Sequence, residues 1–405
     1  MFIESKGWER IIEKNLFDKQ KKQLNKIKKE ISKKNKDFAF LKNEENNQIF
    51  ELIKKAKLKF KKLDEILLIG TGGSSLGTKA LLKVINNEKI SFLSNLDPNT
   101  IKLYLKKNKK KNIGLLIISK SGETLEVLSL FDIIINSLKK QVDLKNHTLI
   151  ITDNRKSTLR LVAEKYNIQV IDHDEEIGGR FSCFSITSLL PLYVAGVDSV
   201  NIKKLADSYF KKILGNCFNF NNSVSALSCI SKKKKYIGHV FLVYIDSFNK
   251  ISEWYRQLWS ESLGKNKAGM HLITAEGAVD QHSQLQMWLD GPKNLIFTVV
   301  VPNARVLDIK ITDIKNVLPN YLKSKNIGEI LNIMAKSTIT ELQKFGIPVR
   351  IIYLDDDQTK SAVDLMTMLL LEVTLLGKLI GINPFDQPAV ENVKIRVKKT
   401  LNKHE

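Results

Sequence analysis

The sequence predicts an α/β protein built from two doubly wound parallel-sheet subdomains with flanking N- and C-terminal helices. Short apolar, β-branched runs alternate with helical stretches from about residue 61, and the alternation restarts after a helical stretch in the middle of the chain. Strands that alternate with helices form a parallel sheet with helices on both faces. The length of 405 residues suits two or three domains. We divide the chain into an N-terminal helical segment, a first subdomain, a second subdomain and C-terminal helices, at residues 1–60, 61–200, 201–360 and 361–405.

The first half of the chain supplies the first sheet. Residues 1–60 are rich in lysine, and their apolar residues recur every three or four positions, which indicates amphipathic helix. Four apolar runs follow that we expect as buried strands, at Glu65–Gly70, Ile113–Ser119, Thr148–Thr152 and Gln169–Ile171. A helical stretch from about Ser182 to Lys232 separates this sheet from the next.

The second half repeats the pattern and ends in helices. Its expected strands are His239–Ile245, Leu295–Val301 and Val349–Leu354. A helix is expected at Ser252–Leu263, ended by Gly264. The tail is expected to form a long helix from Lys360 to about Leu379, a break at Gly381–Pro384 and a last helix from about Pro388. No low-complexity linker separates the halves, so we expect them to pack closely.

The net charge of +22 raises the question of nucleic-acid binding. Only 8 of the 65 basic residues are arginine, however, whereas base readout relies on the planar fork of arginine. The lysines are spread along the whole chain, without the aromatic residues of an RNA-binding sheet. We therefore expect a generic basic surface that attracts anionic substrates, and no specific nucleic-acid partner.

Neither a membrane nor a metal is indicated. No apolar run reaches the roughly 18 residues that a membrane span needs, and the N-terminus lacks the basic-then-apolar order of a secretory signal. We expect a cytoplasmic protein with no membrane partner. Cys183, Cys217 and Cys229 have no C-x-x-C spacing, and no histidine pair has metal-ligand spacing. Disulfides and metal centres are therefore not expected.

A glycine-rich turn at Gly70–Gly77 follows the first strand and opens a helix. Backbone N–H groups and the helix dipole at such a turn can receive an anion. Neither nucleotide template fits, because the dinucleotide motif needs glycine at Ser75 and the P-loop needs lysine directly after Gly77. The alternative is that the glycines only allow tight packing of strand against helix.

A second polar turn, Ser119-Lys120-Ser121-Gly122-Glu123-Thr124, follows the next strand of the pattern. Three hydroxyls and consecutive backbone amides at a helix N-terminus form a cradle for a phosphate dianion, which needs several donors on one side. The alternative is an ordinary helix cap, with Ser119 or Ser121 as the capping residue. Two such turns after successive strands favour the phosphate interpretation, and both interpretations can hold together.

Two further groups of polar residues are candidates for chemistry. Arg180 follows Gly178 and Gly179, so a ligand can approach the backbone there while the arginine meets negative charge; a plain turn with a surface ion pair is the alternative. Gln257 and Glu261 lie four residues apart on a predicted helix and share a face. A lone helical carboxylate is usually solvated, so Glu261 gains interest only from the other motifs.

The last candidates are one histidine of the second subdomain and two polar residues of the C-terminal tail. His282 belongs to the segment Gln281–Gln284, which we expect to begin a helical stretch, and no spacing pairs it with another metal ligand, so a structural histidine is the alternative. Gln387 and Lys394 are two helical turns apart and therefore share a face.

Taken together, six segments resemble the glucose-6-phosphate isomerase (phosphoglucose isomerase) family of the short bacterial type. They occur in family order from about residue 66 to residue 398. Ile69–Gly77 is similar to I-G-x-G-G-S-x-L-G, Ser119–Glu126 to S-K-[ST]-x-x-T-x-E, Gly178–Leu192 to G-G-R-[FY]-S followed by L-L-P-L, Gln257–Lys265 to Q-x-x-x-E-S-x-G-K, Gln281–Gln284 to Q-H-S-Q, and Asn383–Lys394 to N-P-F-D-Q-P-x-V-E-x-x-K. The resemblance implies two subdomains of the sugar-isomerase (SIS) type.

The resemblance also implies a reaction and its residues. The reaction is the reversible isomerisation of glucose 6-phosphate and fructose 6-phosphate through an enediolate, in glycolysis and gluconeogenesis, with no cofactor. Glu261 would move a proton between C2 and C1, and Arg180 would stabilise the enediolate. His282 and Lys394 would handle ring opening. The substrate would be bound or positioned by Gly73, Ser74, Ser119, the Lys120 backbone, Ser121, Thr124, Gly179, Gln257 and Gln387.

In this family the protein is a homodimer, and the histidine that matches His282 reaches the active site of the other subunit. The resemblance therefore implies shared active sites, with residues 275–281 as an exchanged loop. Three residues depart from the family pattern. Glu123 puts a negative charge beside the phosphate loop, while Ala389 and Val393 replace frequent glycines near Lys394.

Two other functions remain open from the sequence. One is another phosphosugar aldose–ketose isomerase, such as an enzyme that also acts on mannose 6-phosphate. The other is a non-catalytic SIS-domain regulator that binds phosphosugars, because Ser-Gly-Glu-Thr is common in such domains. A regulator would need the phosphate loop but not the four catalytic candidates together, which favours an enzyme.

Overall fold

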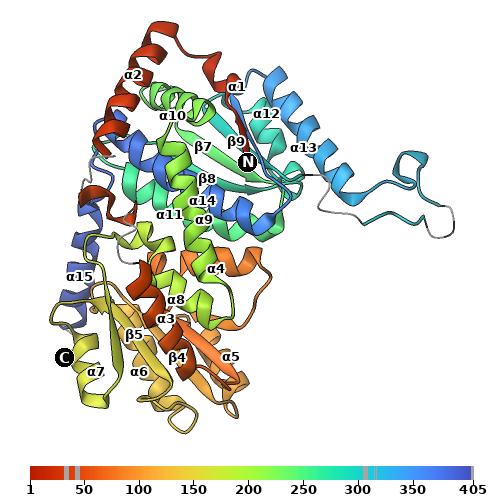
Figure 1. The fold of residues 1–405 in the computed structure, drawn as a ribbon. Helices are drawn as coiled ribbons and strands as arrows, with labels where there is room; N and C mark the ends of the chain where they lie inside the picture. The colour runs from red at the N-terminus through yellow and green to blue at the C-terminus, as the bar shows by residue number, and fades with distance from the viewer. Residues whose placement is uncertain (32–35, 42–45, 304–308, 314, 316, 403–405) are drawn as a thin grey trace.

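The computed structural model describes residues 1–31, 36–41, 46–303, 309–313, 315 and 317–402, and two five-stranded sheets form its centre (Figure 1). The first sheet is parallel throughout, with strand order β3-β2-β4-β5-β6. Its strands are β2 (Glu65–Ile69), β3 (Ile90–Leu93), β4 (Ile113–Ile118), β5 (Thr148–Asp153) and β6 (Gln169–His173).

The second sheet has the order β1-β10-β9-β7-β8 and is parallel except for β1. Its strands are β1 (Phe2–Glu4), β7 (Gly238–Val243), β8 (His271–Glu276), β9 (Leu295–Val301) and β10 (Val349–Tyr353). Strand β1 runs antiparallel to β10, with Ile3 opposite Ile352. Trp8 of α1 (Lys6–Glu9) is fully buried, and its indole N–H donates to the carbonyl oxygen of Phe297 at 3.1 Å. The first residues of the chain therefore close the β10 edge of this sheet.

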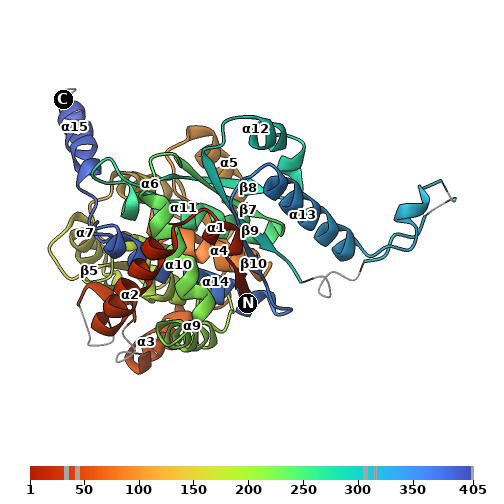
Figure 2. The ribbon, with the colours of Figure 1, turned by 90° about the horizontal axis from the view of Figure 1, so that it is seen from above.

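Helices surround the sheets and connect them (Figures 1 and 2). The first part of the chain forms α2 (Lys14–Ile31), α3 (Asn46–Lys59), α4 (Leu76–Val84), α5 (Pro98–Asn108), α6 (Leu125–Ser137) and α7 (Thr158–Tyr166). The chain then forms α8 (Ile186–Val194), α9 (Ser199–Leu214), α10 (Phe218–Ser231), α11 (Asn249–Leu263), α12 (Leu285–Asp290), α13 (Ile327–Lys344), α14 (Gln358–Leu379) and α15 (Glu391–Leu401). Helix α2 packs against α10. None of the described helices is long and apolar enough to cross a bilayer.

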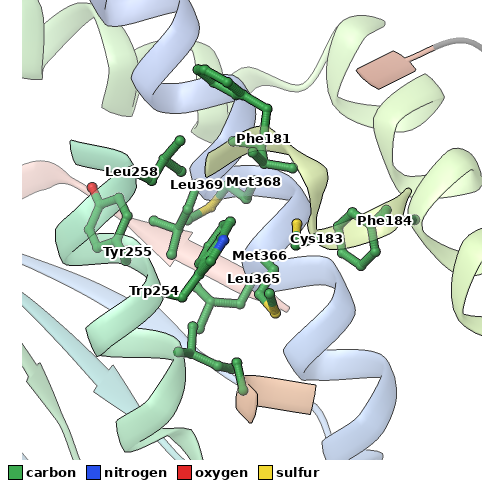
Figure 3. Packing of buried hydrophobic residues seen from close by; sticks show 14 of the residues in the cluster. Phe181, Cys183, Phe184, Trp254, Tyr255, Leu258, Leu365, Met366, Met368 and Leu369 are labelled. Atoms are coloured by element: carbon green, nitrogen blue, oxygen red, sulfur yellow. The ribbon is translucent and has the colours of Figure 1, made fainter. Parts of the chain in front are cut away.

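Helices α11 and α14 form the packing centre between the two sheets. Trp254, Tyr255 and Leu258 of α11 pack with Leu365 and other apolar residues of α14, and the segment after Arg180 adds Phe181, Cys183 and Phe184 (Figure 3). The same hydrophobic cluster includes residues of both sheets. The two halves of the chain thus pack closely, as expected, and α11 is held rigidly between them.

The structure corrects the predicted elements mainly at short strands. Residues 2–4 form β1 where helix was expected, and residues 32–35 and 42–45 of the expected helical segment lie outside the described part of the chain. Strands β3 and β8 were missed, because β3 has four residues and β8 is an edge strand with both ends exposed. The prediction of a loop at residues 275–281 is wrong for its first two residues, because Ala275 and Glu276 belong to β8.

Candidate active site

The glycine-rich turn and the Ser119–Thr124 loop lie at the same edge of the first sheet. Strands β2 and β4 are parallel neighbours, with Ile69 paired to Ile117. Because β3 lies on the other side of β2, the strand order reverses between β2 and β4. Both turns therefore lie at the carboxyl ends of the strands at the topological switch point, where open α/β sheets bind ligands.

Two glycines let this turn contact distant parts of the chain. A Cβ atom on Gly73 would lie 2.1 Å from the carbonyl oxygen of Gly179, so only glycine allows this approach. Gly72 has a φ of +53°, and a Cβ atom there would lie 2.6 Å from Nε2 of Gln257. These two glycines pack the turn, with half-buried Ser74, against the Gly179–Arg180 backbone and α11, and not a strand against a helix as in the alternative that we considered.

Arg180 is buried at the centre of the candidate site, with 4% of its surface exposed. Its Nε–H donates to Ser262 Oγ at 2.8 Å, and Nη1 lies 3.4 Å from Glu261 Oε2 and 3.3 Å from Gln387 Oε1. Burial lowers the pKa of Arg180, and the negative charge of Glu261 opposes this shift. Because an arginine keeps its proton in proteins, a fixed cation lies beside the Glu261 carboxylate.

The same guanidinium fastens the C-terminal loop to the end of α11. Its Nη2 donates to the carbonyl oxygens of Pro384 at 2.5 Å and Asp386 at 3.0 Å. Lys265 follows α11, donates to the carbonyl oxygen of Asn383 at 2.5 Å and pairs with the Asp386 carboxylate at 2.8 Å. The hydrogen bond from Lys265 lowers the pKa of Asp386. These contacts hold the loop that carries Gln387 across the end of the helix.

Glu261 is oriented from two sides and open on a third. Its Oε1 accepts a hydrogen bond from Gln257 Nε2 at 2.9 Å, while Arg180 lies against Oε2. Its side chain is 29% exposed, and it lines a cavity of about 870 Å³ together with Lys265, Gln387 and neighbouring residues. A carboxylate that faces a cavity while an amide and a guanidinium fix its direction has the geometry of a general base.

The Ser119–Thr124 loop presents hydroxyl groups at the start of α6. The hydroxyls of Ser119 and Thr124 share a hydrogen bond of 2.8 Å, and Ser121 is exposed. Lys120 turns its side chain away, since Nζ donates to the carbonyl oxygens of Glu175 at 2.8 Å and Ile177 at 2.9 Å. The Lys120 ammonium is therefore not directed to a ligand in the loop.

The single chain does not bring His282 or Lys394 to the other candidates. His282 is exposed in the turn before α12, and none of the polar contacts described for the chain involves its ring. Lys394 pairs with Glu391 at 2.7 Å on α15, a helix that buries none of its residues. Neither residue lines the cavity beside Glu261. Within the described ranges, no group of three or more histidine, cysteine, aspartate or glutamate side chains is arranged to hold a metal ion.

The contacts that hold Arg180 in place could not be predicted from the sequence motifs alone. Ser262 and Lys265 belong to the Gln257–Lys265 motif, so their position beside Glu261 was a signal that we did not use. The carbonyl oxygens of Pro384 and Asp386 leave no trace in the sequence, because any residue type supplies a carbonyl.

The fold is that of the SIS phosphosugar isomerases. A crystal structure of a hypothetical protein from Thermus thermophilus matches with a TM-score of 0.82 and 26% identity, over 96% of this chain and 95% of that chain. A glucose-6-phosphate isomerase structure from Chlamydia trachomatis matches with a TM-score of 0.76 and 20% identity, over 89% and 73% of the two chains, which shows a shared fold.

Sequence comparison gives the family. The phosphoglucose isomerase family model matches residues 36–291. The glucose-6-phosphate isomerase of Methanocaldococcus jannaschii is 35% identical over 82% of each chain, and that of Campylobacter jejuni is 34% identical over 83% of this chain and 85% of its own. The chain belongs to the phosphoglucose isomerase family, as the sequence motifs indicated.

Proposed function

We propose that the protein catalyses the reversible isomerisation of glucose 6-phosphate and fructose 6-phosphate. The observation that carries this proposal is the Glu261 carboxylate at the edge of a cavity, 3.4 Å from the buried Arg180 guanidinium, in a chain of this family. Several relatives at 30–35% identity bear the name glucose-6-phosphate isomerase. The substrate class is therefore a phosphosugar.

The geometry suits proton transfer through an enediolate. Glu261 takes the proton from C2 of the open-chain aldose and returns it to C1, while a proton moves from the C2 hydroxyl to the C1 oxygen. Negative charge develops on the enediolate oxygens, and a preorganised cation such as Arg180 stabilises it most when water is excluded. Gln257 keeps the carboxylate pointed at the cavity, and Gln387 positions the sugar from the opposite loop.

Phosphate binding is assigned to the Ser119–Thr124 loop, with Gly73, Ser74 and Gly179 beside it. Exposed Ser121 and the amides at the start of α6 offer the converging donors that a dianion requires. No cofactor has a role in this scheme. We include action in the cytoplasm in this proposal.

The proposal also includes a homodimer with shared active sites. His282 is exposed and lies outside the cavity of its own chain, as a residue that serves a second chain would. Helix α15 buries no residue and exposes Val393, Ile395 and Leu401, which a second copy would cover. Lys394 on this helix pairs with Glu391, so it would have to leave this ion pair to act on a substrate.

A coupled assay tests the function. Purified protein is given glucose 6-phosphate, fructose 6-phosphate or mannose 6-phosphate separately, and formation of the isomer is followed. We expect interconversion of the first two. Equal turnover of mannose 6-phosphate would instead support the dual-specificity enzyme, and binding of all three without turnover would support a phosphosugar-binding regulator.

A further inference from the structure

Glu123 is the one acidic residue of the Ser119–Thr124 loop, which is proposed to bind a phosphate. A carboxylate next to a bound dianion weakens binding by like-charge repulsion. In the structure the side chain points elsewhere. Its Oε1 accepts a hydrogen bond of 2.5 Å from the backbone N–H of Thr158, and its Oε2 accepts one of 2.9 Å from the Thr158 hydroxyl.

Thr158 is the first residue of α7, so Glu123 binds the N-terminus of a neighbouring helix. The residue in the capping position, Ser157, makes no side-chain capping hydrogen bond, and its buried hydroxyl has no partner among the described residues. The first amides of a helix need acceptors, and the positive end of the helix dipole favours an anion. Glu123 supplies both from 35 positions earlier in the chain.

Backbone contacts attach the rest of the loop to the same place. The amide of Leu159 donates to the carbonyl oxygen of Gly122 at 3.2 Å, and the amide of Asp153 donates to that of Lys120 at 2.9 Å. Gly122 has a φ of +67°, and a Cβ atom there would lie 2.3 Å from the Ser157 hydroxyl. The loop is therefore pressed against the end of β5 and the start of α7.

Glu123 also connects this attachment to the phosphate-binding hydroxyls. Its own backbone N–H donates to Ser121 Oγ at 3.2 Å, and Thr124, the next residue, shares its hydroxyl hydrogen bond with Ser119. When the carboxylate fixes the position of Glu123, it also fixes the amide that orients Ser121. The helix dipole of α7 meanwhile offsets the negative charge that a phosphate would otherwise meet.

We propose that Glu123 is a positioning residue for the phosphate site: by binding the N-terminus of α7, it holds the Ser119–Thr124 loop in the shape that receives a phosphate. This inference rests on the proposed function, because it takes the loop to be the phosphate site. It reverses the expectation from charge alone, under which removing Glu123 would improve binding.

The test measures phosphate affinity in matched variants. Inorganic phosphate and fructose 6-phosphate are titrated by calorimetry into wild-type protein, Glu123→Ala, Glu123→Gln and Thr158→Val, well below the melting temperature of each. Thr158→Val removes only the hydroxyl partner and lies outside the loop. Glu164→Ala is the control, because it removes one exposed negative charge from the same helix, α7, away from Thr158.

We expect Glu123→Ala to weaken both affinities about 5- to 30-fold, if the about 1–2 kcal/mol that a strong helix cap contributes is lost from the support of the loop. Thr158→Val should weaken them less, Glu123→Gln should lie between wild type and Glu123→Ala, and Glu164→Ala should stay within about twofold, because a surface charge change has little effect. In steady-state kinetics, KM for fructose 6-phosphate should rise while kcat changes little, since Glu123 does not touch the reacting carbons.

The outcomes separate this inference from the proposed function. Unchanged or tighter phosphate binding by folded Glu123→Ala overturns the inference, even when its melting temperature falls, because the role is then only structural. If wild-type protein binds phosphate but isomerises no sugar, the isomerase proposal fails while the effect of Glu123 can still be measured. If wild-type protein binds neither ligand, both fail.

Discussion

Replacing Glu372 tests whether a buried ion pair holds the core beneath α11. Glu372 of α14 and Arg350 of β10 both have fully buried side chains and form a two-point contact. Tyr255 of α11 donates to Glu372 Oε1 at 3.0 Å, and Arg350 donates to Ser223 at 2.8 Å and to Thr298 at 3.0 Å. The network therefore joins α11, α14 and the second sheet.

Glu372→Gln keeps the volume but leaves the Arg350 charge buried without a counter-charge. Removing one partner of a buried pair costs about 3–5 kcal/mol, which is a large part of a total unfolding free energy of about 5–15 kcal/mol. The double variant Arg350→Met/Glu372→Gln buries no charge, and its loss is mainly the hydrogen bonds to Ser223 and Thr298, about 1 kcal/mol each. We therefore expect the double variant to be less destabilised than the sum of the two single variants.

Urea unfolding, followed by circular dichroism and tryptophan fluorescence, measures these free energies in all four proteins. The expected coupling between the two positions is at least about 2 kcal/mol, within the range found for residues of one network. A cost below about 1 kcal/mol for Glu372→Gln, or simple additivity in the double variant, would refute the reasoning, since either result means that the pair is not electrostatically isolated from water.

The remaining predictions concern the site and the fold. Glu261→Gln should lower kcat by about 10²–10⁴ and leave phosphosugar binding largely intact, as loss of a general base does; turnover within a few-fold of wild type would contradict the assignment. Inactive Glu261→Gln and His282→Ala should regain activity when unfolded and refolded together, because a mixed dimer has one intact site; no recovery, with mixed dimers shown by mass, would reject shared sites. Extended chelation should leave activity unchanged, and a loss restored by a divalent metal would disagree. Burial lowers the pKa of Lys28 from 10.5 to about 8, so the unfolded chain binds more protons at this residue between these values, and Lys28 should make the unfolding free energy rise with pH there; Lys28→Met should make that rise smaller in unfolding curves taken at several pH values.

The strands that were predicted well are those whose burial is visible in the sequence. Strand β4 is a continuous apolar run, strand β9 is apolar except for the buried Thr298, and both strands are covered on both faces, as strands inside a parallel sheet are. Strands β1, β3 and β8 are short or lie at sheet edges, where a partner strand and not the local pattern decides the structure. The local sequence therefore predicted the central strands and the edge strand β6, and it missed the other three edge strands.

The residues of the candidate site were likewise predicted where a local motif marks them and missed where a distant contact decides the structure. Glu261, Gln257 and Arg180 were found because each belongs to a local motif, and the structure brings them together. The direction of the Glu123 side chain depends on Thr158, which is far along the chain, so the local pattern suggested a repulsive charge instead. Lys394 pairs with Glu391 on an exposed helix, a placement that the spacing from Gln387 did not indicate.

Closure of the second sheet by β1 has a consequence for the order in which the protein folds. Trp8 and Phe297 are 289 positions apart, so the hydrogen bond of the Trp8 indole and the pairing of β1 with β10 form only after β9 and β10 are made. Contacts of such long range slow folding, because a large loop must close before they form. The first sheet can assemble during synthesis, while the β10 edge of the second sheet stays open to other chains until the N-terminus returns to it. A truncation before Trp8 would therefore appear first as aggregation during expression, ahead of any change at the active site.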